Sequence, residues 1–159
     1  MKIIEMLMVV LLSFSIGCVI SVILVTKILM PKVVSYMMLS KKNLQIMDIF
    51  KAWLIMLEKG KTIDTFFLQN GYMTIAICGM GYLGERLLAA LEGTDIKVKY
   101  VIEQKKDVDY GITPVCSPDD DLESVDVIVI TPISYYYSIR EQLSKKVDCK
   151  FVSIEELFY

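Results

Sequence analysis

A long run of apolar residues without charge opens the chain. No residue from Met6 to Thr26 is charged, and Leu, Ile, Val, Met and Phe dominate the segment. A helix rises about 1.5 Å per residue, so this segment spans roughly 30 Å, the thickness of the hydrocarbon core of a bilayer. A cleaved signal peptide has a shorter apolar core and a small-x-small cleavage site, which residues 27–31 do not offer. We therefore expect an uncleaved transmembrane anchor over residues 1–30, with Pro31 just beyond its end.

An amphipathic pattern follows in residues 31–71. From about Lys41 apolar residues recur at helical spacing, namely at Ile46, Ile49, Phe50, Trp53, Leu54 and Leu57. Gly60 is placed to end this helix, and Thr62 is placed to cap a second, short helix that stops at Asn70-Gly71. The pattern favours a helical linker that packs on the domain after it. The other interpretation places the first helix in the membrane interface, which suits Trp53 and the lysines.

From Tyr72 onward short apolar strands alternate with helices. The pattern predicts strands at residues 72–78, 97–102, 112–116, 125–131 and 150–153, and helices at residues 83–91 and 134–146. Such alternation is typical of a parallel sheet with crossover helices. We expect an α/β domain over residues 72–159, a small Rossmann-like parallel sheet of about five strands. Its ligand crevice would lie at the carboxyl ends of the first and fourth strands.

The charges beside the anchor predict its orientation. Lys2 and the terminal amine precede it, partly offset by Glu5, whereas four lysines follow it: Lys27, Lys32, Lys41 and Lys42. Cytoplasmic flanks carry the excess of Lys and Arg. We expect a single-pass protein of the inner (cytoplasmic) membrane, with its soluble domain in the cytoplasm.

Composition argues against several kinds of site. The net charge of −2 implies no general attraction to nucleic acid. The chain has no histidine and four isolated cysteines, which predicts reduced thiols and no metal site. Between Lys106 and Arg140 the charged residues are all acidic: Asp107, Asp109, Asp119, Asp120, Asp121, Glu123 and Asp126. We interpret this stretch as a solvated rim, in which adjacent aspartates cap a turn rather than bind a metal.

The candidate chemistry lies in a glycine loop between the first strand and its helix. Gly79-Met80-Gly81-Tyr82-Leu83-Gly84 is a complete GxGxxG motif. In this motif the first glycine permits the tight turn, the second lets the backbone approach a pyrophosphate, and the third lets the helix press on the sheet. The amino terminus of the helix then offers unpaired N–H groups to the phosphates. The loop is therefore a candidate phosphate-binding site.

Two further residues belong to this candidate site. Glu103 ends the second strand, about 20 positions beyond the loop, where a carboxylate accepts hydrogen bonds from ribose hydroxyls. This favours NAD over NADP, although Lys105 and Lys106 could instead bind a 2′-phosphate. Thr131 ends the fourth strand, beside the expected crevice.

With these motifs, residues 72–159 resemble a short NAD(P)-binding Rossmann-fold domain. More particularly, the segment is similar to the small Rossmann-like domains of bacterial surface-polysaccharide and glycosyltransferase systems. The resemblance rests on IAICGMGYLGERLLAAL, VKYVIEQ, GITPV, DVIVITPI and DCKFVSIEELFY. It implies that a dinucleotide or a nucleotide-sugar is the ligand, more than it implies any reaction.

Three functions remain open on this basis. The first is a membrane-anchored nucleotide-binding module, an accessory or sensing component of surface-glycan assembly. The second is a minimal NAD(P)-dependent oxidoreductase or nucleotide-sugar-modifying enzyme, completed by a partner or a second copy. The third is a membrane scaffold without a ligand. The intact glycine loop and the lack of an evident nucleophile–base pair favour the first.

Tyrosines follow the fourth strand in the run Ser134-Tyr135-Tyr136-Tyr137-Ser138. One of them could stack on a base or donate a proton. Tyr136 is followed four residues later by Arg140, which does not titrate usefully, so the run differs from an activated Tyr-x-x-x-Lys pair. The favoured interpretation is that the rings cover the start of a helix.

Small residues recur every fourth position in the anchor, at Ser13, Gly17 and Ser21. This spacing lets two helix backbones approach closely in lipid. The expected partners are a second copy of the chain or another membrane protein, and small residues are also common in such helices without any partner.

Overall fold

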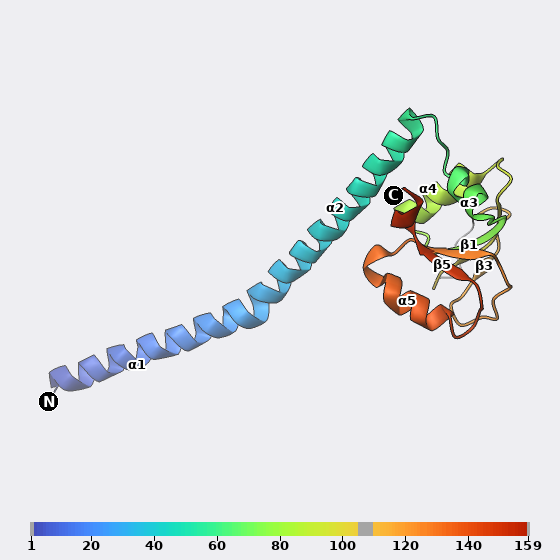
Figure 1. Ribbon diagram of the computed structural model, residues 1–159. Helices are drawn as coiled ribbons and strands as arrows, with labels where there is room; N and C mark the ends of the chain where they lie inside the picture. The colour runs from blue at the N-terminus through green and yellow to red at the C-terminus, as the bar shows by residue number, and fades with distance from the viewer. Residues whose placement is uncertain (1, 105–109, 159) are drawn as a thin grey trace. The chain divides into compact units, whose positions relative to one another are not determined.

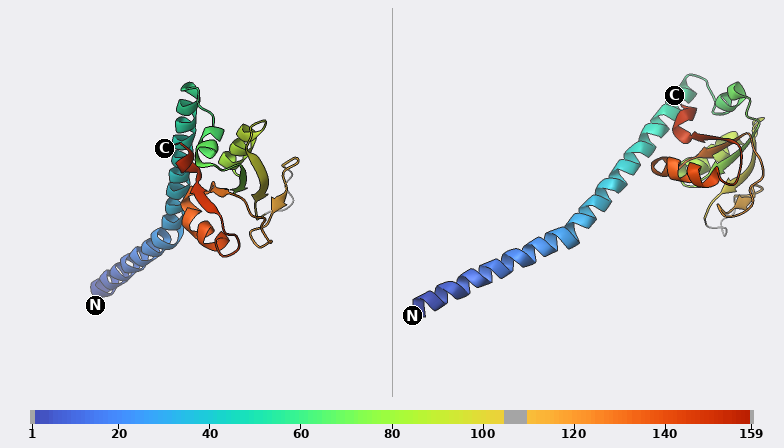
Figure 2. Two further views of the ribbon diagram at one scale, coloured as in Figure 1. Left: turned by 45° about the vertical axis from the view of Figure 1, so that its right-hand side comes forward. Right: turned by 60° about the horizontal axis from the view of Figure 1, so that its bottom comes forward.

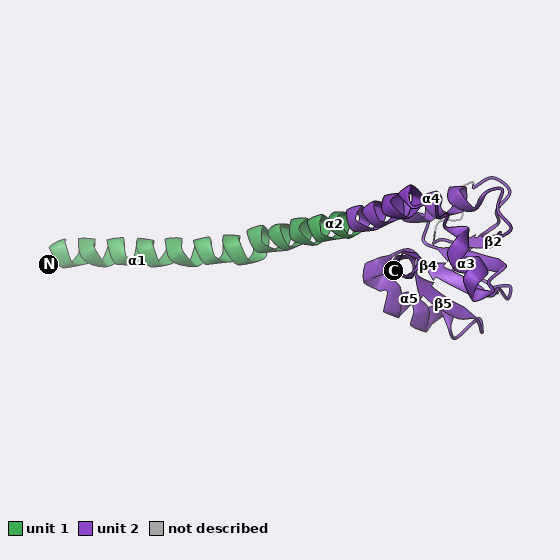
Figure 3. Ribbon diagram, turned by 45° about the horizontal axis from the view of Figure 1, so that its top comes forward, with its two compact units in different colours: residues 1–45 green, residues 46–159 purple. Residues whose placement is uncertain are grey.

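The computed structural model describes residues 2–104 and 110–158. It divides the chain into two compact units, residues 1–45 and residues 46–159 (Figure 3). Lys105, Lys106, Asp107 and Asp109, which the sequence offered as a 2′-phosphate site and as part of the acidic rim, lie outside the described residues. We call residues 46–159 the sheet unit.

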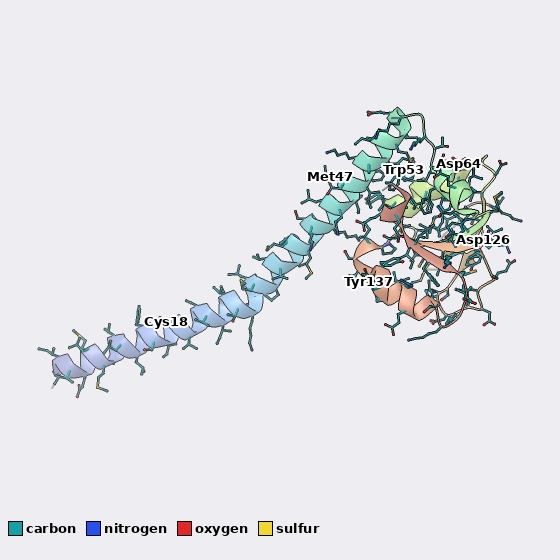
Figure 4. All side chains as sticks on the ribbon, viewed as in Figure 1. Cys18, Met47, Trp53, Asp64, Asp126 and Tyr137 are labelled. Carbon is teal, nitrogen blue, oxygen red and sulfur yellow. The ribbon has the colours of Figure 1, made fainter. Side chains whose placement is uncertain are left out.

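The first unit is helical throughout its described residues. It contains α1 (Lys2–Ile23), the π-helix η1 (Leu24–Leu29) and the first part of α2 (Met30–Glu58). Every described side chain as far as Leu44 is exposed, and the helix is long and apolar enough to cross a membrane. Figure 4 shows Cys18 among the side chains that project from α1.

The helix does not end at Pro31, where the sequence placed its end. A proline lacks an N–H, and its ring clashes with the carbonyl four residues earlier, so it normally breaks a helix. Here the backbone widens into η1 just before the proline, and the Met30 N–H bonds to the Val25 carbonyl. A π-helical turn changes which carbonyls are paired and in this way accommodates the proline.

The sheet unit has five parallel strands in the order β3-β2-β1-β4-β5 (Figure 1, Figure 2). The strands are β1 (Thr74–Cys78), β2 (Lys97–Ile102), β3 (Val115–Cys116), β4 (Val127–Ile130) and β5 (Lys150–Ser153). The helices are the end of α2, α3 (Asp64–Asn70), α4 (Tyr82–Leu91), the 3₁₀ turn η2 (Ile133–Tyr135), α5 (Tyr136–Leu143) and the 3₁₀ turn η3 (Ile154–Leu157). This is the α/β fold that the sequence predicted.

Alternate residues of the central strands face two separate cores. Ile75 and Ile77 of β1 pack in one core with α2, α3 and α4, whereas Ala76 and Cys78 pack in the other with α5. Side chains of a strand point alternately to its two faces, so a strand covered on both sides is apolar throughout. Helices therefore cover both faces of the sheet, with α4 and α5 on opposite sides.

The amphipathic part of α2 packs on the sheet. Ile49 and Trp53 are buried there together with Phe67 of α3, and Figure 4 shows Trp53 on the side of α2 toward the unit. This is the favoured of the two arrangements that the sequence allowed. Gly60 and Gly71 end the two helices in the left-handed conformation, as predicted.

Three local predictions were wrong. Thr62 does not cap α3, because the helix begins at Asp64 with Ile63 in the capping position and no side-chain cap. β3 is shorter than residues 112–116, since only its last two residues pair with β2, and Ile112 is fully exposed. The helix expected at residues 134–146 starts as the 3₁₀ turn η2 after Pro132 and ends at Leu143.

Candidate functional site

The glycine loop joins the carboxyl end of β1 to the first turn of α4. Gly79 has φ = 90°, a backbone conformation that side chains rarely adopt, and an added Cβ would lie 2.7 Å from the ring of Pro132. At Gly84 an added Cβ would overlap the carbonyl oxygen of Gly79. Both glycines are therefore required by the fold itself: one makes the turn, and the other lets α4 approach the loop.

Gly81 differs from these two glycines. Its φ of −81° and ψ of −166° are open to any residue, and an added Cβ would meet no atom within 4 Å. It occupies the capping position of α4, where Ser, Asp or Asn would serve at least as well as glycine. The fold gives no reason for a glycine here. The space beside it is consistent with close approach of a ligand to the backbone.

Beside this loop the carboxyl edge of the sheet contains a cavity of about 420 Å³. Its wall comes from the ends of β1 and β2, from Pro118 and Pro132 beyond β3 and β4, and from one face of α5. The lining residues are Cys78, Gly79, Ile102, Glu103, Gln104, Pro118, Pro132, Tyr135, Ser138, Ile139, Gln142 and Leu143. This volume falls within the range of about 300–1,000 Å³ typical of small-molecule sites. The cavity includes the carboxyl end of β1, one of the two strand ends at which the sequence placed the crevice, and Pro132 just after the other, β4.

Glu103 forms part of the cavity wall, and its carboxylate is held in place by two backbone groups. Oε2 accepts the Met80 N–H at 2.9 Å, and Oε1 accepts the Gln104 N–H at 2.9 Å. A carboxylate has about four lone-pair positions, and within residues 2–104 and 110–158 two of them are used by these bonds. The side chain is thus fixed beside the loop and keeps acceptor capacity for hydroxyl groups of a ligand.

Thr131 is at the carboxyl end of β4, but it does not line the cavity. Its hydroxyl donates to the Gly79 carbonyl at 2.6 Å, and its N–H donates to the Cys78 carbonyl at 3.0 Å. The side chain is 6% exposed. Thr131 therefore ties the ends of β1 and β4 together and positions the loop.

The other loop residues face in different directions. The side chains of Met80 and Leu83 are buried in the core beneath α4, and the Met80 N–H is already donated to Glu103, so of these two residues only Leu83 could offer its N–H to a ligand. Tyr82 is 76% exposed at the first position of α4. In an α-helix the first N–H groups have no partner within the helix, so the amides of this turn are the donors that α4 could offer to a ligand.

The tyrosines after β4 divide between the two roles that the sequence offered. Tyr135 lines the cavity. Tyr136 is half-buried over the core beneath α5, and its hydroxyl donates to the Phe151 carbonyl at 3.1 Å. Tyr137 is 82% exposed and projects outward from α5 (Figure 4). Tyr135 alone of the three tyrosines is placed to touch a ligand in this cavity.

Burial raises the pKa of Cys78 in the cavity wall and of Tyr110. Burial, with a smaller effect from the Glu103 carboxylate, raises the pKa of the Cys78 thiol to about 12. The thiol is therefore protonated at neutral pH and is an apolar part of the wall rather than a nucleophile. Burial, followed by the Glu103 and Glu85 carboxylates, also raises the pKa of Tyr110.

Several lining residues were not identified from the sequence. Gln104, Ser138 and Gln142 supply the polar groups of the cavity beside Glu103. The signal for Gln104 was its position directly after a strand end. The signal for Ser138 and Gln142 was their spacing of four residues, which places both on one face of a helix. Neither signal distinguishes these residues from ordinary exposed ones.

The acidic stretch has structural roles in its described part. Asp120 Oδ2 accepts the Ser117 N–H at 2.8 Å in a turn, and Asp119 forms an ion pair with Lys146 at 3.6 Å. Within residues 2–104 and 110–158 no group of three or more His, Cys, Asp or Glu side chains is arranged to hold a metal ion.

No protein-family model matches this chain, and no curated protein or solved structure shows significant similarity to it. The function is therefore argued from the geometry of the site.

Proposed function

We propose that the sheet unit binds a nucleotide, with its phosphates on the loop around Gly81 and its nucleoside in the adjoining cavity. The observation that carries this proposal is the contrast among the three glycines. At Gly79 and Gly84, close contacts within the chain explain why the residue has no side chain. At Gly81 no such contact does. A phosphate that approaches the backbone needs that position to be bare.

The polar groups of the cavity support the same ligand. Glu103 is held by two N–H groups with acceptor capacity left over, which suits the hydroxyls of a ribose. The amide groups of Gln104 and Gln142 can pair with the edge of a base, and Tyr135 offers a ring to stack on it. A free 2′-hydroxyl suits the Glu103 carboxylate better than a 2′-phosphate does, so we favour NAD over NADP among dinucleotides.

The biological setting follows from the rest of the chain. The helix that begins at Lys2 is apolar and long enough to anchor the protein in a membrane, and the lysines after the apolar segment favour a cytoplasmic sheet unit. We propose a single-pass protein of the inner membrane that acts as an accessory or sensing component of bacterial surface-glycan assembly. This role rests on the resemblance that the sequence motifs of residues 72–159 suggest, and the comparisons with known proteins add no support to it.

Calorimetry on the full-length protein in detergent tests the nucleotide site. We expect at least one of NAD(H), NADP(H) or a UDP-sugar to bind, and Gly81→Val to abolish that binding, because the new side chain would occupy the phosphate position. Ala90→Val is the matched control, since it adds the same side chain at an exposed position of α4 away from the loop. Unchanged binding in Gly81→Val would overturn the loop assignment. Absence of binding by every nucleotide would favour a scaffold without a ligand.

A further inference from the structure

The cavity at the carboxyl edge reaches from the ends of β1 and β2 to the segment that follows β4, and its lining stops short of β5. Its wall contains the ends of β1 and β2, Pro118 after β3, Pro132 after β4, and side chains of η2 and α5. It contains no residue of β5 and none of η3. A dinucleotide has two nucleosides, and in a doubly wound sheet they lie on opposite sides of the point where the strand order reverses. That point here is between β1 and β4.

The side beyond β4 is filled by the chain itself. η3 follows β5 directly and is fixed by a capping box, in which Ser153 and Glu156 exchange bonds with each other's backbone N–H groups. Ile154 is fully buried and Leu157 is 5% exposed, both in the core that contains Trp53. The carboxyl end of β5 is therefore covered by packed side chains rather than left open for a second nucleoside.

The reversal point itself is closed. The Thr131 hydroxyl bonds to the Gly79 carbonyl at 2.6 Å, and the Pro132 ring lies so near Gly79 that no side chain fits between them. The contacts of Thr131 and Pro132 with Gly79 therefore block the path of a ligand from the cavity toward the β4 side of the loop. On the other side the space next to Gly81 is open, and Tyr82 at the start of α4 is exposed.

We propose that the ligand has a single nucleoside, held in the cavity, with a diphosphate that leaves over Gly81 and the first turn of α4 toward solvent. The ligand class is a nucleoside diphosphate ester, and a dinucleotide gains nothing from its second base. This inference rests on the proposed nucleotide site. Glu103 lies against the loop, since its Oε2 accepts the Met80 N–H, and Glu85 lies in the first turn of α4. These two carboxylates disfavour the extra charge of a free terminal phosphate, so an ester is preferred to a free nucleoside diphosphate.

The comparison of ADP-ribose with NADH tests the inference, because the two share an adenosine and a pyrophosphate diester and differ in the nicotinamide. Calorimetry on the full-length protein in detergent would measure both, with UDP-glucose and GDP-mannose as probes of other bases. We expect the dissociation constants of ADP-ribose and NADH to agree within about threefold, or UDP-glucose or GDP-mannose to bind where neither adenine compound does. Tighter binding of NADH by tenfold or more would overturn the single-nucleoside site and leave the nucleotide site standing. No binding by any of the four would overturn both.

A pair of serine variants locates the nucleoside. Ser138→Phe places a ring in the cavity wall, and Ser144→Phe places the same ring just after α5, outside the lining residues. We expect Ser138→Phe to weaken binding of the best probe at least tenfold and Ser144→Phe to leave it within twofold. The thermal transition of each variant, followed by far-UV circular dichroism, verifies that the sheet unit is folded. Equal binding by folded Ser138→Phe and wild-type protein would overturn the placement of the nucleoside in this cavity.

Discussion

The indole of Trp53 lies 5.3 Å from the ring of Phe158, with an angle of 40° between the two planes. Trp53 lies in α2, and Phe158 is the residue directly after the 3₁₀ turn η3. Trp53 is 8% exposed and belongs to the core beneath α4. The contact therefore joins α2 to the residue after η3, and it makes residues 46–58 of α2 part of the folded sheet unit.

Trp53→Ala should lower the stability of the sheet unit by about 3–5 kcal/mol, the usual cost of removing a large buried aromatic side chain. Thermal unfolding of the full-length protein in detergent, followed by far-UV circular dichroism, would measure the change. Leu54→Ala is the matched control, because Leu54 is the next residue and is 60% exposed. We expect the control to stay within about 0.5 kcal/mol of the wild type. Equal losses in the two variants would mean that α2 does not pack on the sheet through this face.

The sequence predicted the packing of α2 because the relevant signal is local. The predicted stripe has residues at helical spacing, and such a stripe must be covered by another apolar surface. Ile46, Ile49, Phe50 and Trp53 are covered, whereas Leu54 and Leu57, which the same stripe included, are exposed. The same reasoning failed at Pro31, since the effect of a proline depends on whether the backbone can change its pairing, and the π-helical turn before it does so. No residue of that turn indicates in the sequence that it will be π-helical.

Gly84→Ala and Gly81→Ala should separate the two roles of the glycine motif. A methyl group at Gly84 would overlap the Gly79 carbonyl oxygen, so we expect a loss of about 1–3 kcal/mol or more in unfolding free energy. The same methyl group at Gly81 meets no atom within 4 Å, and we expect a change of no more than about 1 kcal/mol. Thermal melts of the two variants would show this difference. A Gly81→Ala protein as unstable as Gly84→Ala would show that Gly81 is also required by the fold.

Glu103→Gln should weaken nucleotide binding and also reduce stability. Both carboxylate oxygens accept a backbone N–H, so a glutamine would set its own N–H₂ group against one of these donors. Leaving such a donor unpaired costs about 1–3 kcal/mol. We expect at least a tenfold weaker dissociation constant for the nucleotide that binds the wild type, measured by calorimetry.

Glu85→Gln is the control for this change, because it removes a nearby carboxylate on α4 that lies outside the cavity lining. It should bind as tightly as the wild type, or more tightly, since one negative charge near the phosphates is lost. If Glu103→Gln bound the nucleotide with wild-type affinity, Glu103 would have no role in holding a ribose.

The sequence predicted the approximate position of the cavity but not most of its lining. The GxGxxG spacing and the strand pattern predict a crevice at the carboxyl ends of β1 and β4, and the cavity is lined by the end of β1 and by Pro132 after β4. Thr131 was expected to face that crevice, yet its hydroxyl bonds to Gly79, because a buried hydroxyl takes the nearest free carbonyl. The contributions of Gln142 and Ser138 depend on how α5 is rotated over the sheet, which is a property of tertiary packing.

Asp126→Asn should remove a pH-dependent part of the stability of the sheet unit. The Asp126 carboxylate accepts the N–H of Thr74 at 2.7 Å, the Thr74 hydroxyl at 2.8 Å and the N–H of Met73 at 2.9 Å, which joins the starts of β1 and β4. These bonds, those of Thr74 first, lower the pKa of Asp126 below its usual range. A lowered pKa in the folded state means that the stabilisation is complete above the unfolded value, about 4, and is lost as the pH falls toward the folded value.

Wild-type stability should therefore exceed that of Asp126→Asn by a constant amount above about pH 5, and the difference should shrink below pH 4. Thermal melts from pH 7 to pH 2.5 would measure it, with Asp121→Asn, an exposed aspartate in the preceding loop, as the control. A difference that grew as the pH fell would contradict the assigned direction of the pKa shift.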